Sequence, residues 1–320
     1  MAVTTSSAER PAADAPTRFS AHTRLLVVAP HPDDETIANG LLIQQVRAAG
    51  GEVGIVLLTD GDNNPWPQRW LERRLRIDAA GRRRWGERRH VELLQAMQRL
   101  GLPPAALQQL HWPDLGVTSR LLSAPRAAAS ALASAIGAFG PDLVVAPALG
   151  DRHPDHGAAH VLVRLALAQL PRVPALLTYM VHGSECAPPV LELQGSPAEQ
   201  AAKRFALSAH GSQLALGGGR MRRFADRAER FFAVSGPGAA PGGGLPWRPP
   251  VALHPWLRLS LVDAAGARTW RWHEAPLQRD DPGGYRLSPR HGEAASPRFA
   301  HLALAVRSPW IFDHWGWCEL

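Results

Sequence analysis

Two hydrophobic patterns alternate along most of the chain. Short runs rich in Val and Leu at residues 24–30, 53–58 and 142–146 have the length and composition of strands that are buried on both faces. Longer segments with an apolar residue every three or four positions, such as 35–49, are typical of amphipathic helices. Strand and helix in turn predict an α/β fold with a Rossmann-like, mostly parallel sheet flanked by helices.

The same alternation continues as far as residue 234. Further strands are expected at 107–112 and 175–181, and further helices at 87–100, 125–139, 157–170, 198–209 and 221–231. The first 22 residues are rich in Ala, Ser, Thr and Pro and predict a flexible N-terminal tail. The α/β domain is therefore expected to span residues 23–234.

The composition changes beyond residue 234. Residues 235–250 are dense in Gly and Pro, which predicts a linker. Alternating segments at 256–262, 269–272 and 299–306 then predict a small β-rich module over residues 251–320, with a hairpin between the first two segments. The tryptophans of this module indicate an aromatic core more than a set of glycan-binding platforms.

Composition narrows the class of protein. The chain has 320 residues, of which 45% are hydrophobic, enough to bury a substantial core. No run of about 18 apolar residues occurs, so no transmembrane helix is expected. The N-terminus lacks the basic start and apolar stretch of a secretory signal. The two cysteines, Cys186 and Cys318, are too few for a disulfide framework, and we expect a cytoplasmic protein.

The chain is strongly basic, with a formal charge of +7 and a pI of about 10.7. Most basic residues are arginines, and they are densest between residues 69 and 89, where tryptophans lie among them. A solvated helix face is the favoured interpretation of this stretch, ahead of a phosphate, lipid-headgroup or nucleic-acid contact. We therefore expect no nucleic-acid partner, and the sequence leaves the oligomeric state open.

A histidine and several carboxylates follow the first predicted strand, as His31, Asp33, Asp34 and Glu35. In open α/β sheets, ligands bind outside the carboxyl ends of the strands. Histidine and carboxylate side chains at that edge are the usual ligands of a catalytic zinc ion. The alternative is that Asp33 and Asp34 only cap the next helix, but capping needs one such residue.

A second cluster, DRHPDH at residues 151–156, follows the predicted strand 142–146. The two clusters occupy equivalent places and should converge on one crevice, because the carboxyl ends of parallel strands meet at the same edge. A catalytic zinc site uses three protein ligands and leaves a position for water. Spacing alone cannot choose between Asp33 and Asp34, or among the histidines at 153, 156 and 160.

These motifs resemble those of the PIG-L, or LmbE-like, family of N-acetylglucosaminyl deacetylases, which includes GlcNAc-phosphatidylinositol and mycothiol-type deacetylases. The resemblance rests on APHPDDE at 29–35 and HPDH at 153–156, and it extends over residues 24–232. Weaker matches are LTDG at 58–61, Arg89 with Glu92, the segment from Lys203 to Gln213, and Glu229 with Phe231. The chain departs from the family at Ala38-Asn39-Gly40, where paired glycines are frequent, and beyond residue 240.

The resemblance implies a metal site and a general base. His31, Asp34 and His156 become the ligands of Zn²⁺, with Fe²⁺ as the alternative, and Asp33 becomes the general base. If His31 and His156 bind one ion, their ligand atoms must lie within about 5 Å, because each bond is about 2 Å long.

The resemblance also implies further roles around the reacting group. His153 stabilises the oxyanion or protonates the leaving amine, and Asp155 orients His153. Arg89 and Asp114 contact the substrate. The expected function is metal-dependent hydrolysis of an N-acetyl group from an N-acetylated sugar or glycoconjugate. A related amidohydrolase for another acyl group and a non-catalytic basic binding protein are the alternatives.

Overall fold

The computed structural model describes residues 19–183, 187–234, 244–280, 283–288, 297–306 and 311–320. Most of the predicted N-terminal tail, residues 1–18, and much of the predicted linker lie outside the described residues. Within the described ranges, no helix has both the length and the apolar character that crossing a membrane requires.

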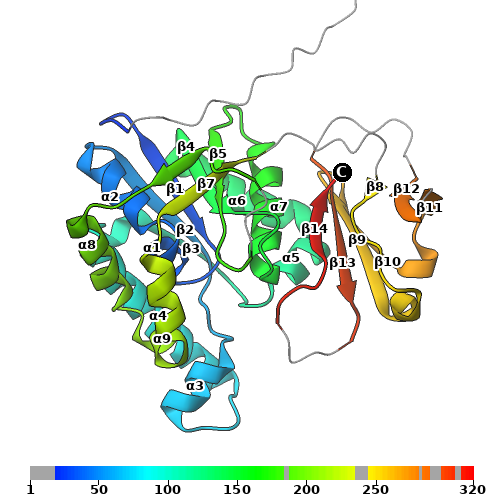
Figure 1. The fold of residues 1–320 in the computed structure, drawn as a ribbon, viewed down its shortest axis with the longest axis horizontal. Helices are drawn as coiled ribbons and strands as arrows, with labels where there is room; N and C mark the ends of the chain where they lie inside the picture. Colours follow the sequence, from blue (N-terminus) through cyan, green and yellow to red (C-terminus); the bar gives the residue numbers. More distant parts are fainter. Residues whose placement is uncertain (1–18, 184–186, 235–243, 281–282, 289–296, 307–310) are drawn as a thin grey trace, which may run out of the picture.

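A seven-stranded sheet forms the centre of the α/β part (Figure 1). Its strands lie in the order β3-β2-β1-β4-β5-β7-β6, and the first five are parallel to one another. The bounds are β1 Arg24–Ala29, β2 Glu52–Thr59, β3 Leu107–Trp112, β4 Leu143–Pro147, β5 Ala175–Tyr179, β6 Leu191–Leu193 and β7 Glu229–Ala233. The predicted α/β fold with a mostly parallel sheet is confirmed.

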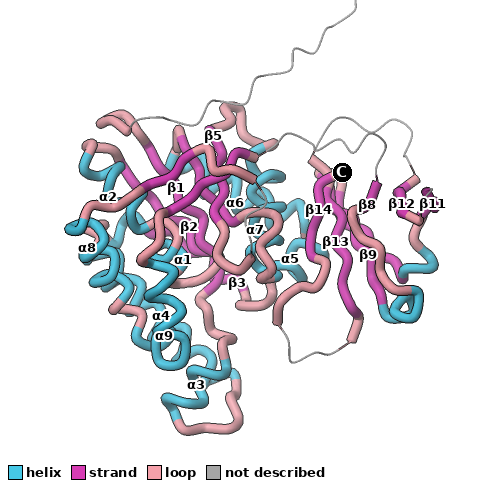
Figure 2. The backbone as a smooth tube through the Cα atoms, viewed as in Figure 1, coloured by secondary structure: helices cyan, strands magenta, loops and turns pink. Residues whose placement is uncertain are grey.

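Helices cover both faces of this sheet, as the α/β pattern requires (Figures 1 and 2). They are α1 Asp34–Ile37, α2 Gly40–Ala48, α3 Pro65–Glu72, α4 Ala79–Arg99, α5 Val117–Ser123, α6 Pro125–Phe139, α7 Pro154–Leu167, α8 Pro197–Leu207 and α9 Gly211–Ala225, with 3₁₀ turns at Pro104–Ala106, Val251–Trp256 and Trp272–Glu274. Successive β1 side chains point to opposite faces. Leu26 and Val28 pack with α5, α6 and α7, whereas Leu25 and Val27 pack with α2, α4 and α8.

Two predicted helices differ from the structure. The helix expected at 35–49 is broken between α1 and α2, because Asn39 leaves the helical backbone (φ −132°) and its amide donates to the Asp34 carbonyl at 3.2 Å. The helix expected at 221–231 is wrong in its second half, where β7 lies. There Glu229 and Phe231 are buried and Arg230 is exposed, which is the two-residue period of a strand. This strand, β7, pairs with β5 and β6.

The C-terminal part is antiparallel. One sheet has the order β10-β9-β13-β14 and another the order β11-β12-β8. The bounds are β8 Gly244–Leu245, β9 Leu257–Asp263, β10 Gly266–Arg271, β11 Leu277–Asp280, β12 Gly284–Leu287, β13 Phe299–Leu304 and β14 Gly316–Glu319. The predicted hairpin is formed by β9 and β10. The division of the chain into units at residues 234 and 250 stays a prediction.

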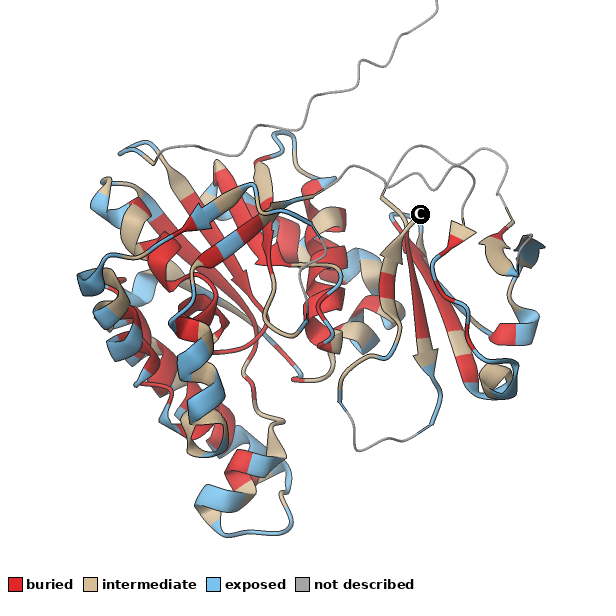
Figure 3. Ribbon diagram, in the orientation of Figure 1, coloured by how far each residue is buried: buried red, intermediate tan, exposed pale blue. Residues whose placement is uncertain are grey.

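The four-stranded C-terminal sheet packs directly on α7 (Figure 3). Phe299 and Trp317 belong to the same buried cluster as the α6 and α7 side chains. Arg164 of α7 donates to both carboxylate oxygens of Glu319, at 2.9 and 2.8 Å. The C-terminal sheet and the α/β part therefore share one hydrophobic core.

A buried ion pair and two hydrogen bonds join β7 to helices α8 and α2. The Lys203 ammonium donates to Glu229 Oε1 at 2.6 Å, and the same carboxylate accepts the first backbone N–H groups of α2, from Leu41 at 2.8 Å and Leu42 at 2.9 Å. Both charged side chains are at least 96% buried. Glu229 thus accepts hydrogen bonds from the N-terminus of α2 and also balances the charge of the buried Lys203 ammonium.

We predict that Glu229→Ala lowers the free energy of unfolding by about 3–5 kcal/mol, because it leaves the Lys203 ammonium buried without this partner. Urea denaturation measures the loss. The control is Glu192→Ala, which removes the partly exposed partner of Arg230 at 2.9 Å and should cost less than about 1 kcal/mol. Equal losses in the two variants would contradict the prediction.

Candidate metal centre

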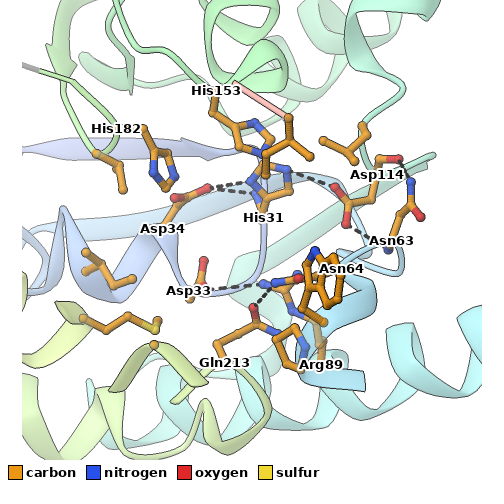
Figure 4. A pocket seen from close by; sticks show the side chains of 18 of the residues that line it. His31, Asp33, Asp34, Asn63, Asn64, Arg89, Asp114, His153, His182 and Gln213 are labelled. Carbon is orange, nitrogen blue, oxygen red and sulfur yellow. Dashed lines mark hydrogen bonds and ion pairs between the residues drawn. The ribbon is translucent and has the colours of Figure 1, made fainter. Parts of the chain in front are cut away.

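Polar side chains from several loops meet at the carboxyl edge of the parallel strands (Figure 4). His31 follows β1, Asp114 follows β3, residues 151–156 follow β4, and His182 follows β5. All of these loops leave the sheet at the same edge because the strands that they follow are parallel. The convergence of the two clusters that the sequence analysis expected is present in the structure.

Three ligand atoms lie at nearly equal distances from one another. His31 Nδ1 lies 3.3 Å from His156 Nε2, and Asp34 Oδ2 lies 3.4 Å from each of these nitrogens. A tetrahedral ion with bonds of about 2.0–2.1 Å needs ligand atoms about 3.3–3.4 Å apart. All three side chains are buried. The donor set of two imidazoles and a carboxylate fits a divalent zinc or iron ion.

Two other groupings of potential ligands include atoms that already accept backbone hydrogen bonds. The ring nitrogens of His31, His153 and His156 lie within 4.8 Å of one another, but His153 Nδ1 already accepts the Asp155 N–H. His31 Nε2 lies 3.3 Å from both Asp114 Oδ1 and Asp155 Oδ2, but the Asp155 carboxylate already accepts two backbone N–H groups. The triad of His31, Asp34 and His156, with donor atoms 3.3–3.4 Å apart, is the candidate ligand set.

Each histidine of the triad has a carboxylate at its other nitrogen. His156 Nδ1 lies 3.1 Å from Asp151 Oδ2, and His31 Nε2 lies 3.3 Å from Asp155 Oδ2. Metal-binding histidines usually donate their second N–H in this way, which sets the ring orientation. Asp151 had no role in the sequence analysis. The available signal was its place in the loop after β4, five residues before the candidate ligand His156.

The Asp155 carboxylate, predicted to orient His153, contacts other groups in the structure. It accepts the backbone N–H groups of Leu115 at 2.7 Å and Val117 at 3.1 Å, and it faces His31. Only the backbone N–H of Asp155 reaches His153, at 3.3 Å from Nδ1. The reason is geometric, because Asp155 lies in the first turn of α7 and its side chain points across to the loop after β3. Asp155 therefore faces His31 and not His153 in the structure.

His153 has a defined tautomer. It precedes α7 as its N-cap, and its Nδ1 accepts the Asp155 N–H, so the ring proton lies on Nε2. Burial, together with the neighbouring His31 and His156, lowers the pKa of His153 well below its usual value. A neutral His153 with an Nε2–H donor results.

Asp33 lies beside the triad with a strained backbone. Its φ of 129° is outside the regions that residues with a Cβ usually adopt. Its carboxylate lies 3.3 Å from Arg89 Nη2. Burial raises the pKa of Asp33 to about 6, with Arg89 opposing the shift and Asp34 adding to it.

Arg89 connects several of the loops at this edge. Its guanidinium donates to the carbonyls of Pro32 and Gly61, and the residue is 3% exposed. Gly61 has a φ of 62°, and a Cβ there would lie 2.0 Å from Arg89 Nη1. The glycine of the LTDG segment is therefore required by the close approach of Arg89. Of the basic stretch at 69–89, Arg69 and Arg89 line the cavity described below, whereas most of the other arginines are exposed.

Several of the remaining motif residues form hydrogen bonds with one another. His210 Nε2 lies 3.0 Å from Glu35 Oε1, and the Glu92 carboxylate accepts the N–H and hydroxyl of Ser212 at 2.9 and 2.6 Å. His160, a further candidate in the sequence, lies apart from the triad, with Nδ1 3.0 Å from the Pro147 carbonyl oxygen.

A cavity of about 630 Å³ opens beside the triad (Figure 4). Asp33, Asp34, Arg89, Asp114, His31 and His153 line one side of it. Asp114 also accepts the backbone N–H of Asn63 at 2.9 Å, which leaves its carboxylate at the cavity wall. The structure thus brings two of the candidate ligands, His31 and Asp34, to one cavity with the candidate base and both candidate substrate-binding residues.

The α/β part has relatives among known proteins. Residues 26–167 match the family model described as PIG-L, GlcNAc-PI de-N-acetylase. A 1D-myo-inositol 2-acetamido-2-deoxy-alpha-D-glucopyranoside deacetylase of Mycolicibacterium smegmatis is 35% identical over 161 residues, 46% of this chain and 54% of that protein. The 2'-N-acetylparomamine deacetylase of Streptomyces fradiae is 36% identical over 167 residues, 49% of this chain and 56% of that protein. The chain spans about half the length of the curated relatives it matches.

A solved structure is similar in fold. The N,N'-diacetylchitobiose deacetylase from Pyrococcus horikoshii matches 66% of this chain and 84% of its own length, with a TM-score of 0.51 and 21% sequence identity. At this identity, the likeness concerns the fold.

We predict that Asp151→Asn weakens Zn²⁺ binding by roughly 10- to 100-fold, because the amide is a weaker acceptor for the His156 N–H. Calorimetric titration of the metal-free protein with Zn²⁺ measures the affinity. The control is Asp60→Asn, since Asp60 forms a similar pair with His111 at 2.8 Å in an exposed position away from the triad. An unchanged affinity in Asp151→Asn would refute the orienting role.

Proposed function

Residues 26–167 belong to the PIG-L family, and from this premise we propose that the chain is a metal-dependent N-deacetylase. It hydrolyses the acetamide of an N-acetylated sugar or glycoconjugate and releases acetate and a free amine. The observation that carries the proposal is the triad of His31, Asp34 and His156, with donor atoms 3.3–3.4 Å apart beside a cavity.

The proposed cofactor is Zn²⁺, with Fe²⁺ as the alternative, held by His31, Asp34 and His156. When bound, a divalent ion there supplies Lewis-acid polarisation of the acetamide carbonyl and lowers the pKa of water towards neutrality. Asp151 and Asp155 hold the two imidazoles so that Nε2 of His156 and Nδ1 of His31 face the ion.

Asp33 is the proposed general base. It lies next to a ligand in the chain but its carboxylate is directed to Arg89, which leaves it beside the triad instead of within it. A water proton passes to Asp33 as the water oxygen forms a bond with the acetamide carbon. The C–N bond then breaks, and the proton passes from Asp33 to the leaving nitrogen.

His153 is the proposed hydrogen-bond donor to the developing oxyanion. Its Nδ1 is occupied by the α7 cap, so Nε2–H is the donor that remains for the cavity. A neutral N–H donor of this kind stabilises negative charge by donating a hydrogen bond to it. Donors placed at an oxyanion typically contribute about 3–4 kcal/mol to the transition state.

The substrate class follows from the cavity and the relatives. Asp114 and Arg89 place a carboxylate and a guanidinium at the cavity wall, suitable for sugar hydroxyls and for a carbonyl. The relatives from Mycolicibacterium smegmatis and Streptomyces fradiae are named for N-acetylated amino-sugar substrates. A small N-acetylated sugar or glycoconjugate is therefore the proposed partner.

We predict that Asp33→Ala lowers kcat for acetate release by about 10²- to 10⁴-fold and leaves the Zn²⁺ content nearly unchanged. Asp34→Ala is the matched variant, because it removes the adjacent carboxylate and should lose both metal and activity. Acetate release and elemental analysis are measured on both proteins. Loss of metal in Asp33→Ala would mean that Asp33 is the metal ligand and Asp34 the general base. Full activity in both variants would mean that the active site lies elsewhere.

We also predict that a screen of N-acetyl sugars, nucleotide sugars and lipid-linked sugars yields free amine that a chelator abolishes. Adding back Zn²⁺ or Fe²⁺ separately identifies the ion that restores turnover. Amine formation that persists after complete metal removal would contradict the proposed function. Turnover only of substrates with other acyl groups would favour the related amidohydrolase.

A further inference from the structure

The cavity beside the triad has a second side that is apolar. Neither the metal centre nor the proposed acetamide chemistry uses it. Four segments far apart in the sequence form this side, and their apolar residues at the cavity are Ile37, Pro65, Trp66, Pro67, Met221, Phe224, Ile311 and Phe312.

Helix α9 provides the floor of the apolar side. Met221 and Phe224 pack in a small cluster with Ile37 of α1, one helical turn from the ligand Asp34. The apolar floor therefore begins next to the triad. A group bound there would be attached to the part of the substrate that carries the acetamide.

The C-terminal part provides a wall. The Phe312 ring centroid lies 5.4 Å from that of His182 and 6.2 Å from that of His153. The next residue, Asp313, anchors this segment, because its N–H donates to the Arg152 carbonyl at 2.8 Å and its carboxylate lies 3.1 Å from His301 Nε2 of β13. This wall lies outside the 26–167 match to the family.

Part of the apolar side faces water. Trp66 is 63% exposed and Ile311 is 47% exposed. Covering such side chains with an apolar group releases water and is favourable. Sugar hydroxyls gain little from the Ile, Met, Pro and Phe side chains that make up most of this surface, because hydroxyls need hydrogen-bond partners when they leave water. The chemistry of the surface therefore fits an apolar group better than a second sugar.

On the basis of the proposed deacetylase function, we propose that this side of the cavity is a subsite for an apolar aglycone, an aryl or alkyl group attached to the N-acetylated sugar. Gly217 of α9 keeps the subsite open. It lines the cavity, and a Cβ built on it would meet no atom within 4 Å. A large side chain at 217 would therefore enter the cavity without displacing the backbone.

The test compares the methyl, phenyl and octyl glycosides of N-acetylglucosamine with the zinc-loaded full-length chain, with free amine as the readout. We expect kcat/KM for the phenyl or octyl glycoside to exceed that for the methyl glycoside by about tenfold or more. A larger gain for phenyl identifies an aryl group, and a larger gain for octyl identifies an alkyl chain.

Gly217→Leu should bring the ratio of kcat/KM values close to one. The matched control is Gly218→Leu, which makes the same change one residue along α9, where the Cβ would lie at an ordinary 3.7 Å from Leu214. The control should keep the wild-type ratio. A wild-type ratio near one, or equal ratios in the two variants, would overturn the subsite.

Absence of amine from every glycoside would count against the deacetylase function, and calorimetric binding of the same three glycosides would then decide the subsite. Tighter binding of the phenyl or octyl glycoside by about tenfold, lost in Gly217→Leu and kept in Gly218→Leu, supports it. Equal binding of all three glycosides by the wild-type protein refutes it.

Discussion

The pairing of β1 with β4 is the constraint on which the site depends. Backbone hydrogen bonds hold residues 25–27 beside residues 143–145, so the loops after the two strands leave the sheet side by side. Adjacent strands lie about 4.8 Å apart, which allows side chains from both loops to reach one point. His31 and His156 are 125 residues apart in the chain, yet their nitrogens lie 3.3 Å from each other.

The concentration of charge at this edge is tolerated because nearly every group has a partner. Asp151 accepts the backbone N–H groups of Val181 and His182 as well as facing His156, and Asp155 accepts two further N–H groups. A buried charge without such partners would cost several kcal/mol. The motif residues therefore form two groups. Some lie at the cavity, and others, such as Glu229 and Lys203, provide partners for buried charges and backbone N–H groups elsewhere.

The C-terminal sheet is part of the same structure as the α/β part. Trp317 packs so closely against α7 that a Cβ at Gly157 would lie 2.7 Å from the Trp317 ring. Glu319 pairs with Arg164 of the same helix. The helix that carries His156 is thus held on its outer side by the C-terminal strands. The segment before β14 also brings Phe312 to the cavity, so the sheet both supports the candidate metal centre and shapes the space beside it.

The sequence by itself determined the α/β class, the strands of the parallel sheet and the two clusters that meet at its edge. Hydrophobic period is a local property, and the carboxyl ends of parallel strands must share an edge, so both follow from residue order. Which atoms face one another was decided only by the tertiary structure. Spacing could not separate Asp33 from Asp34, and it missed the contact of Asp151 with His156, the contact of Asp155 with His31, and the position of Phe312 at the cavity. These depend on loop backbones and side-chain rotamers that are set by contacts between residues far apart in the chain.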